Sequence, residues 1–242
     1  MPEDLQSVRR GVILAGGLGE RLRPFTDAIP KSLLPIGEQS LLEIQIDALS
    51  RHGFREIIIA TNYKSDYIEK FIGDGSKYGV RIIYSRETMP LGTCGPLSLV
   101  KDRLTSSFLV MNGDILTTID FDKLYTSAGR DDALLTVVTK QVRTPFNFGS
   151  VDARGNRIVA VSEKPDLVME VLAGIYIIKP ELLPEIPVNS YFGMDTLISD
   201  MIGQGRAVGR YLMSEYWLDI GKIDDYRQAQ SAYREMFSDA GR

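Results

Sequence analysis

A glycine-rich segment near the N-terminus carries the strongest local signal for chemistry. It reads Leu14-Ala-Gly-Gly-Leu-Gly-Glu-Arg21 and continues the apolar run 11–15. Glycines after a buried strand let backbone amides approach a ligand closely, and successive amides form a concavity for anionic oxygens. Arg21 adds a permanently charged planar fork that suits phosphate, and Lys31, next to Pro30, is a candidate second phosphate contact. The segment therefore predicts a loop that holds a polyphosphate.

Two common phosphate-binding loops do not match these residues. No Gly-Lys-Ser/Thr closes the segment, so it is not a Walker A loop. The pair Gly17 and Gly19 lacks the third glycine of a dinucleotide fingerprint, and the next strand ends in Ala60-Thr61-Asn62 without the acidic residue that would bind a ribose. A plain dehydrogenase is therefore disfavoured.

The scarcity of histidine and cysteine excludes several kinds of catalytic site. The chain has one histidine, His52, and one cysteine, Cys94, among 242 residues. A zinc site and a Ser-His-Asp triad are therefore not expected, and any metal must be a hard cation held by carboxylates. We expect His52 at the C-terminal end of a helix, where imidazole suits the helix dipole, and Cys94 as a small buried hydrophobic residue.

Charge and hydropathy set the expected partners and location. A formal net charge of -4 gives no indication of a nucleic-acid or membrane partner. No apolar run approaches the roughly 20 residues of a membrane span, and residues 1–10 lack the apolar core of a signal peptide. A single cysteine cannot form an internal disulfide, which fits a reducing compartment. We therefore expect a cytoplasmic protein that binds neither nucleic acid nor membrane.

Alternating apolar runs and helical patterns predict the sheet that must position these residues. In the first half, strands are expected at about 11–15, 56–61, 80–85 and 108–112, and helices at about 41–51, 65–72 and 97–104. Continuous apolar strands joined by helices indicate an α/β fold, a mostly parallel sheet with helices on both faces. Ligands of such folds bind beyond the carboxyl ends of the strands. Gly16-Gly17, Thr61-Asn62 and Gly113-Asp114 fall at such ends.

The second half has shorter strands and no linker-like segment. Strands are expected at about 133–140, 157–162, 174–178 and 207–213, with a turn at Gly155-Asn156, and helices at about 194–202 and 224–237. We predict a single domain over 1–242, with a nucleotide-binding half at about 10–115 and a substrate-binding half at about 116–226. The last helix, about 224–237, closes the domain.

Seven short motifs follow one another in the order found in sugar-1-phosphate nucleotidyltransferases. They are Ile13–Leu22, Pro30-Lys31, Pro90-Leu91-Gly92-Thr93, Asn112-Gly113-Asp114, Glu163-Lys164-Pro165, Gly174-Ile175-Tyr176 and Trp217-Leu218-Asp219-Ile220-Gly221. Each motif alone is weak, but seven in order are highly specific, and the chain resembles this family from about residue 11 to about residue 226. The resemblance implies a three-layer, Rossmann-like fold of the nucleotide-diphospho-sugar transferase type.

The resemblance also implies a reaction. The phosphate of a sugar 1-phosphate attacks the α-phosphorus of a nucleoside triphosphate, and pyrophosphate leaves from the opposite side. The attacking phosphate is ionised at neutral pH, so no general base is required and catalysis rests on positioning and charge stabilisation. Mg²⁺ is the implied cofactor, held by Asp114 and Asp219. Arg21 is implied at the β- and γ-phosphates and Lys31 at the α-phosphate, which completes the catalytic set.

The implied binding residues form two sets. The nucleotide set is Leu14, Ala15, Gly16, Gly17, Gly19, Glu20, Arg21, Lys31, Pro90, Leu91, Gly92, Thr93, Asn112 and Gly113. The sugar-phosphate set is Gly149, Glu163, Lys164, Gly174 and Tyr176. In this set Lys164 is implied on the phosphate and Glu163 on the sugar hydroxyls.

The base and the sugar are less well indicated. The short chain resembles heptose-1-phosphate and mannose-1-phosphate guanylyltransferases, which favours GTP. Uridylyl, thymidylyl or cytidylyl transfer to another sugar 1-phosphate stays open. Relatives are often dimers or tetramers, so a homodimer or homotetramer is the implied assembly.

Two further classes of protein compete with this interpretation. A metal-dependent glycosyltransferase predicts Asp-x-Asp at a strand end, which Asn112-Gly113-Asp114 is not. A non-catalytic nucleotide-sugar sensor usually lacks the loop arginine, the lysine or a metal aspartate. Arg21, Lys31, Asp114 and Asp219 are all present, which favours the enzyme.

Overall fold

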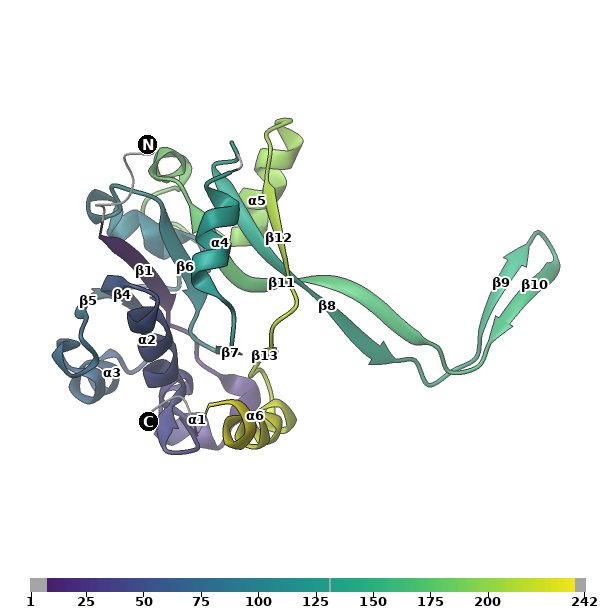
Figure 1. The fold of residues 1–242 in the computed structure, drawn as a ribbon, viewed down its shortest axis with the longest axis horizontal. Helices are drawn as coiled ribbons and strands as arrows, with labels where there is room; N and C mark the ends of the chain where they lie inside the picture. The colour runs from purple at the N-terminus through teal and green to yellow at the C-terminus, as the bar shows by residue number, and fades with distance from the viewer. Residues whose placement is uncertain (1–7, 131, 238–242) are drawn as a thin grey trace.

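A seven-stranded sheet forms the centre of the computed structural model, which describes residues 8–130 and 132–237 (Figure 1). The strands are β1 (Arg9–Leu14), β2 (Pro35–Ile36), β3 (Gln39–Ser40), β4 (Phe54–Thr61), β5 (Arg81–Arg86), β6 (Phe108–Asn112), β7 (Ile115–Thr117), β8 (Leu135–Pro145), β9 (Ser150–Arg154), β10 (Arg157–Ser162), β11 (Asp166–Ile178), β12 (Gly209–Met213) and β13 (Trp217–Asp219). The helices are α1 (Phe25–Ala28), α2 (Leu41–Arg51), α3 (Ser65–Ile72), α4 (Phe121–Ala128), α5 (Met194–Gly203) and α6 (Ile223–Met236).

The order of strands in the main sheet is β12-β8-β11-β6-β1-β4-β5. Strand β11 runs antiparallel to both of its neighbours, and the other adjacent pairs are parallel. The mostly parallel sheet expected from the sequence is therefore confirmed. Because β1, β4, β6 and β8 run the same way, their carboxyl ends share one edge of the sheet, which we call the carboxyl edge.

Helices cover both faces of the sheet because successive strand residues point to opposite sides. Val12 and Ile58, which lie side by side in the parallel register, pack in a core with α5 and the short 3-10 helix Pro180–Glu185. Ile13 and Ile59, one position further on, pack in a core with α2, α3 and α4. The three-layer arrangement is therefore confirmed.

Helix α2 begins where its local sequence provides a cap. The Ser40 hydroxyl accepts the backbone N–H of Glu43 at 3.2 Å, and the Glu43 carboxylate accepts the Ser40 N–H at 2.9 Å, a reciprocal capping box. Leu42, Ile46 and Leu49 repeat at helical spacing and are fully buried against the sheet. The helix ends at Arg51, so His52 does lie at a helix C-terminus.

The segment 97–104 differs from its predicted helix. Two 3-10 helices, Gly95–Leu99 and Lys101–Arg103, occupy this stretch. Pro96 lacks a backbone donor and Gly95 favours freer backbone conformations, and both work against a regular α-helix here. Cys94, at the start, is fully buried as expected, and burial raises the pKa of its thiol to about 12.

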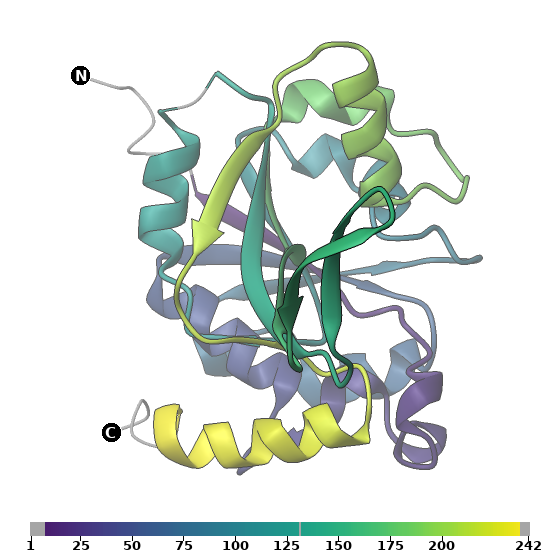
Figure 2. The ribbon, with the colours of Figure 1, turned by 90° about the vertical axis from the view of Figure 1, so that its right-hand side faces the viewer.

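A paired extension leaves the sheet at the carboxyl edge. Strands β8 and β11 pair from Leu135 with Ile178 out to Pro145 with Asp166, with one irregularity in register between Leu172 and Tyr176, and the β9–β10 hairpin continues beyond them. We call residues 140–172 the arm. Figure 1 shows the arm reaching far from the rest of the molecule, which we call the body, and Figure 2 views the body along it. The predicted turn at Gly155-Asn156 joins β9 and β10, but the length of the arm was not foreseen.

Candidate functional site

The glycine-rich loop and the Asn112–Asp114 turn lie side by side at the carboxyl edge. Leu14, the last residue of β1, pairs with Asn112, the last residue of β6. The Gly113 N–H then donates to the Leu14 carbonyl at 2.9 Å. A Cβ atom at position 113 would lie 2.7 Å from that carbonyl oxygen, so a larger residue would push the two loops apart. This close approach delivers Asp114 next to the loop.

Lys31 and Asp114 form the central ion pair of the site. The Lys31 Nζ atom lies 2.6 Å from Asp114 Oδ2, and the two side chains are only 13% and 26% exposed. Together with Ser32 and Gly113 they line a pocket whose other wall is the start of the glycine loop, Leu14, Ala15 and Gly17. The second carboxylate oxygen of Asp114, Oδ1, is buried without a hydrogen-bond partner. This oxygen therefore keeps its full capacity to accept a hydrogen bond or to bind a cation.

The fold brings Asp219 to the same place from a distant part of the sequence. Strand β13 pairs with β7, which sets Asp219 opposite Ile115, and the Ile220 N–H donates to the Asp114 carbonyl at 3.0 Å. The pKa of the Asp219 carboxyl is raised, first by the protein atoms that displace water around it and then by the negative charge of Asp114. The two carboxylates therefore repel each other electrostatically, as expected of a site built to share a cation.

Arg21 completes the charged cluster. It sits in the 3-10 turn Glu20–Leu22, and its guanidinium lies beside Gly221, where an added Cβ would be 3.1 Å from one of its nitrogens. The positive charges of Lys31 and Arg21 lower the pKa of Asp219, opposing the effect of Asp114. The structure therefore brings together Arg21, Lys31, Asp114 and Asp219, the four residues predicted as catalytic.

The two carboxylates fit the needs of a divalent cation. Mg²⁺ is bound in proteins through one or two carboxylates, with substrate phosphates and waters supplying the rest of its ligands. Asp114 offers an unpartnered oxygen, and Asp219 is exposed beside it. The residues present are therefore suited to hold a cation together with a phosphate chain.

Gln45 supports Asp114, and the sequence analysis did not identify it. This side chain is 3% exposed on α2, and its amide donates to the Asn112 carbonyl at 3.0 Å and to the Ile115 carbonyl at 2.8 Å. These bonds fix the backbone on both sides of Asp114. The signal that could have identified Gln45 is its polar amide on the otherwise apolar, inward face of the predicted helix 41–51.

Glu87 supports the predicted base-binding segment Pro90–Thr93, and it was also missed. Its carboxylate accepts the Leu91 N–H at 3.0 Å. Its other oxygen lies close to Gly16, where an added Cβ would be 2.9 Å away. Burial raises the pKa of the Glu87 carboxyl. Glu87 therefore ties this segment to the glycine loop.

The structure holds three of the predicted sugar-phosphate residues away from this cluster. Gly149, Glu163 and Lys164 lie on the arm, where all three are exposed. Glu163 and Gly149 are neighbours, since a Cβ at position 149 would lie 3.3 Å from a Glu163 carboxylate oxygen. Lys164 has a left-handed backbone (φ 45°), which is uncommon for a residue with a side chain. The function predicted for these residues stays a prediction.

The other two predicted sugar-phosphate residues lie in the body. Gly174 is at the carboxyl edge, where an added Cβ would lie 2.6 Å from the Asn112 side-chain nitrogen. Tyr176 is 4% exposed and packs in the core on the α5 side of the sheet. The core position leaves little of the tyrosine side chain exposed, and its predicted sugar contact stays a prediction. The apolar alternation of β11 gave it that position.

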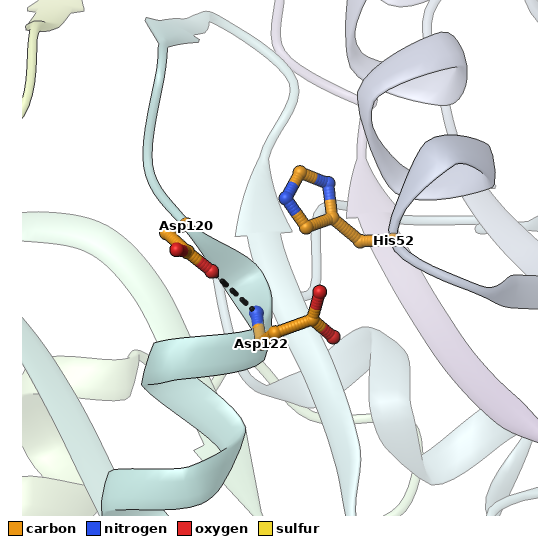
Figure 3. Close-up of side chains that lie close together, drawn as sticks. All are labelled: His52, Asp120 and Asp122. Atoms are coloured by element: carbon orange, nitrogen blue, oxygen red, sulfur yellow. Dashed lines mark hydrogen bonds between the residues drawn. The ribbon is translucent and has the colours of Figure 1, made fainter.

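A second group of ligand-type side chains lies at the opposite, amino-terminal edge of the sheet. His52, Asp120 and Asp122 have nitrogen and oxygen atoms within 4.8 Å of one another (Figure 3). Asp120 caps α4 by accepting the N–H groups of Asp122 and Lys123, and the pKa of its carboxyl is lowered by hydrogen bonds from Lys123. Asp122 pairs with Arg9. The two carboxylates already have partners within the protein.

The model of the nucleotidyl transferase family matches residues 10–236. The mannose-1-phosphate guanylyltransferase catalytic subunit beta of Drosophila melanogaster is 33% identical over 234 residues, which cover 93% of this chain and 62% of that protein. The chain therefore spans less than two thirds of the length of this relative.

Two solved structures of HddC from Yersinia pseudotuberculosis share the fold. One has a TM-score of 0.74 and 26% identity, and the other, complexed with GMP-PN, has 0.73 and 25%. Each match covers 93% of this chain and 100% of that chain. Among the residues that the structure describes, no helix combines the length and the apolar character needed to cross a membrane.

Proposed function

The chain belongs to the nucleotidyl transferase family, and on that premise we propose that it transfers a nucleoside monophosphate from a nucleoside triphosphate to a sugar 1-phosphate and releases pyrophosphate. The observation that carries the proposal is the convergence of Lys31, Asp114 and Asp219 beside the glycine-rich loop. Two polyanions must meet in this reaction. The site supplies fixed cations and a pair of carboxylates suited to hold a further one.

The protein groups act by positioning and by charge. The backbone amides of the glycine-rich loop bind the triphosphate, as expected of a nest of N–H groups after a strand. Arg21 faces the β- and γ-phosphates and stabilises the charge that builds on leaving pyrophosphate. Lys31 is placed between the loop and Asp114, and on binding of the triphosphate its ammonium moves its contact to the α-phosphate. No side chain is needed as a base, because the attacking phosphate is already ionised.

Members of this family generally use a divalent metal ion, and we propose Mg²⁺ held by Asp114 and Asp219. The unpartnered Asp114 oxygen and the mutual repulsion of the two carboxylates support this assignment. A bound Mg²⁺ would supply positive charge to the phosphate oxygens. Gln45 keeps Asp114 in position by fixing the carbonyls on either side of it.

We propose GTP as the nucleotide and mannose 1-phosphate as the first sugar to test. The name of the Drosophila relative and the GMP-PN bound in one HddC structure support guanine. The segment Pro90–Thr93, tied to the glycine loop by Glu87, is the proposed base-binding wall. A heptose 1-phosphate is the alternative sugar, and the cytoplasmic location stays a prediction.

A pyrophosphate-release assay tests the proposal. Purified protein with Mg²⁺ is given each nucleoside triphosphate in turn against mannose, glucose, N-acetylmuramic acid and heptose 1-phosphates. We expect release that requires both GTP and one sugar, and that disappears in Asp114→Asn. The matched control is Asp122→Asn, the same change in the amino-edge group. A folded protein that binds nucleotide but releases no pyrophosphate with any pair would overturn the proposed activity.

A further inference from the structure

The arm carries residues that the proposed reaction needs, but it holds them outside the site of their own chain. Glu163 and Lys164 are exposed at the junction between the β8–β11 ribbon and the β9–β10 hairpin. Within the described chain, the polar contacts between the arm and the body that the structure gives lie at the base of the arm. There Arg210 pairs with Glu170, and Lys140 donates to the carbonyls of residues 214 and 215. The cluster at the carboxyl edge therefore lacks Glu163 and Lys164, the two charged residues predicted to bind the sugar phosphate.

The surface of the arm is built for contact with protein rather than with water. Apolar side chains more than 40% exposed follow one another along it: Phe148, Val151, Ile158, Val159, Val161, Leu167, Val168, Met169 and Leu172. Ile158 and Val159 are successive residues of β10 at an irregularity in its pairing with β9, and both are more than half exposed. A two-stranded hairpin in water is at best marginally stable, and a continuous exposed apolar surface marks an interaction site. The arm therefore requires a cover.

The direction in which the arm leaves the body favours a second copy as that cover. Because β8 runs parallel to β6, the arm leaves from the same edge that holds Asp114 and Asp219. The ladder continues from Leu172 with Thr139 out to Asp166 with Pro145. At about 3.4 Å per residue, this places Lys164 roughly 20 Å beyond the sheet, farther than a lysine side chain reaches. Folding back within the ribbon would break the ladder bonds between Leu172 and Asp166, whereas a second copy can receive the arm with these bonds intact.

We propose that two copies of the chain exchange arms, so that Glu163 and Lys164 of each copy complete the sugar-phosphate end of the site of the other. The exchange forms a twofold-symmetric dimer, in which each copy gives an arm and receives one. The arm offers a contact surface on the scale of the roughly 20–30 residues per side of a stable interface. This inference rests on the proposed function for the role of Lys164, but the exchange itself is a structural statement with its own readout.

The first test is independent of activity. A photo-crosslinking phenylalanine derivative replaces Val161 on the arm, and the matched control places it at Tyr67, an exposed position of α3. Illumination of the Val161 variant should give a species of twice the 27.0 kDa chain mass, cross-linked to carboxyl-edge residues, and the Tyr67 variant should not. A cross-link within one chain, or a monomer by light scattering, overturns the exchange.

The second test mixes two inactive variants. Asp114→Asn removes the body part of the site and Lys164→Ala removes the arm part, and each homodimer should lose activity. Random assortment of exchanging subunits makes half of the dimers mixed, each with one intact site, so co-expression should restore about a quarter of wild-type activity. No recovery with active wild type shows that each arm serves its own chain and overturns the exchange. If wild type is itself inactive, the proposed function has failed, and cross-linking alone decides on the exchange.

Discussion

The sheet holds two groups of carboxylates, one at each edge, and only one of them is free to act. At the amino-terminal edge, His52, Asp120 and Asp122 lie within 4.8 Å of one another, which would satisfy a search for ligand-type side chains. Asp120 is occupied as a helix cap and Asp122 by Arg9. At the carboxyl edge the charged cluster holds two carboxylates, Asp114 and Asp219, and Asp114 keeps a buried oxygen without a partner. An unsatisfied buried atom therefore indicates a site better than the number of ligand-type residues does.

The largest expected effect comes from replacing one carboxylate at each edge and comparing the loss of activity. Asp114→Asn removes a charge that faces Lys31 and the proposed cation, and we expect kcat to fall by about 10²–10³-fold. Asp122→Asn loses only a surface ion pair, which is worth about 0–1 kcal/mol, and should leave kcat within roughly twofold of wild type. Steady-state pyrophosphate release measures both. Equal losses of kcat in the two variants would contradict the assignment of the active site to the carboxyl edge.

Lys31→Met tests whether the ammonium group paired with Asp114 is needed for the reaction. Removing the ammonium leaves Asp114 without its ion-pair partner and the α-phosphate without a protein cation, and we expect kcat to fall by about 10²-fold. Lys77→Met is the control, because Lys77 forms an exposed ion pair with Glu43 away from the site. Single-turnover assays at saturating GTP and sugar phosphate separate chemistry from binding. A Lys31→Met enzyme with wild-type turnover would show that the ion pair is only structural.

Gln45→Leu tests whether the backbone around Asp114 must be fixed. The change strands two buried carbonyls, those of Asn112 and Ile115, and should lower the free energy of unfolding by about 1–3 kcal/mol. The displaced Asp114 should reduce kcat by about tenfold, because small misplacements at a reacting centre are costly. Gln39→Leu, which removes a hydrogen bond to Asp47, is the control with little effect on turnover. Chemical denaturation and pyrophosphate release at a temperature where both variants are folded measure the two quantities.

The smallest effect is expected from Asp120→Ala, which should change stability and leave catalysis unchanged. Loss of the helix cap costs about 1 kcal/mol. Hydrogen bonds from Lys123 lower the pKa of Asp120 below its ordinary value of 3.8, so the stabilisation by the ionised cap is present above that pH and is lost as the pH falls through the folded-state pKa. The difference in Tm between wild type and variant should therefore shrink below about pH 4. A constant difference down to pH 2, or a change in Mg²⁺ dependence, would contradict this assignment.

The sequence was sufficient to predict the body and its chemistry because local patterns dominate there. Buried strands such as β4 and β6 are continuous apolar runs, and the residues after them fall at the carboxyl edge in any parallel sheet. The prediction that Asp114 and Asp219 lie close together depended on the family resemblance, because their proximity results from the pairing of β13 with β7, which are distant in the sequence. The position of Gln45 among the inward apolar residues of its helix marks it as unusual, but its role depends on partners that lie far away in the sequence.

The arm shows what a single chain's sequence does not determine. The strand pattern of 157–162 and the turn at Gly155-Asn156 were recognisable, and both were found. The direction of the ribbon depends on how far β8 and β11 stay paired beyond the sheet. The residues of this stretch do not alternate between a buried and an exposed face, so the sequence does not indicate that direction. Tyr176 shows the same limit: its motif implied a sugar contact, and its position in β11 points the side chain into the core.

The most direct test of the account is to locate the metal ion. Crystals grown with Mn²⁺ and a non-hydrolysable GTP analogue would show the ion by its anomalous scattering. We expect a peak between Asp114 and Asp219, against the phosphates of the analogue. A peak at His52, Asp120 and Asp122, with none at the carboxyl edge, would contradict it.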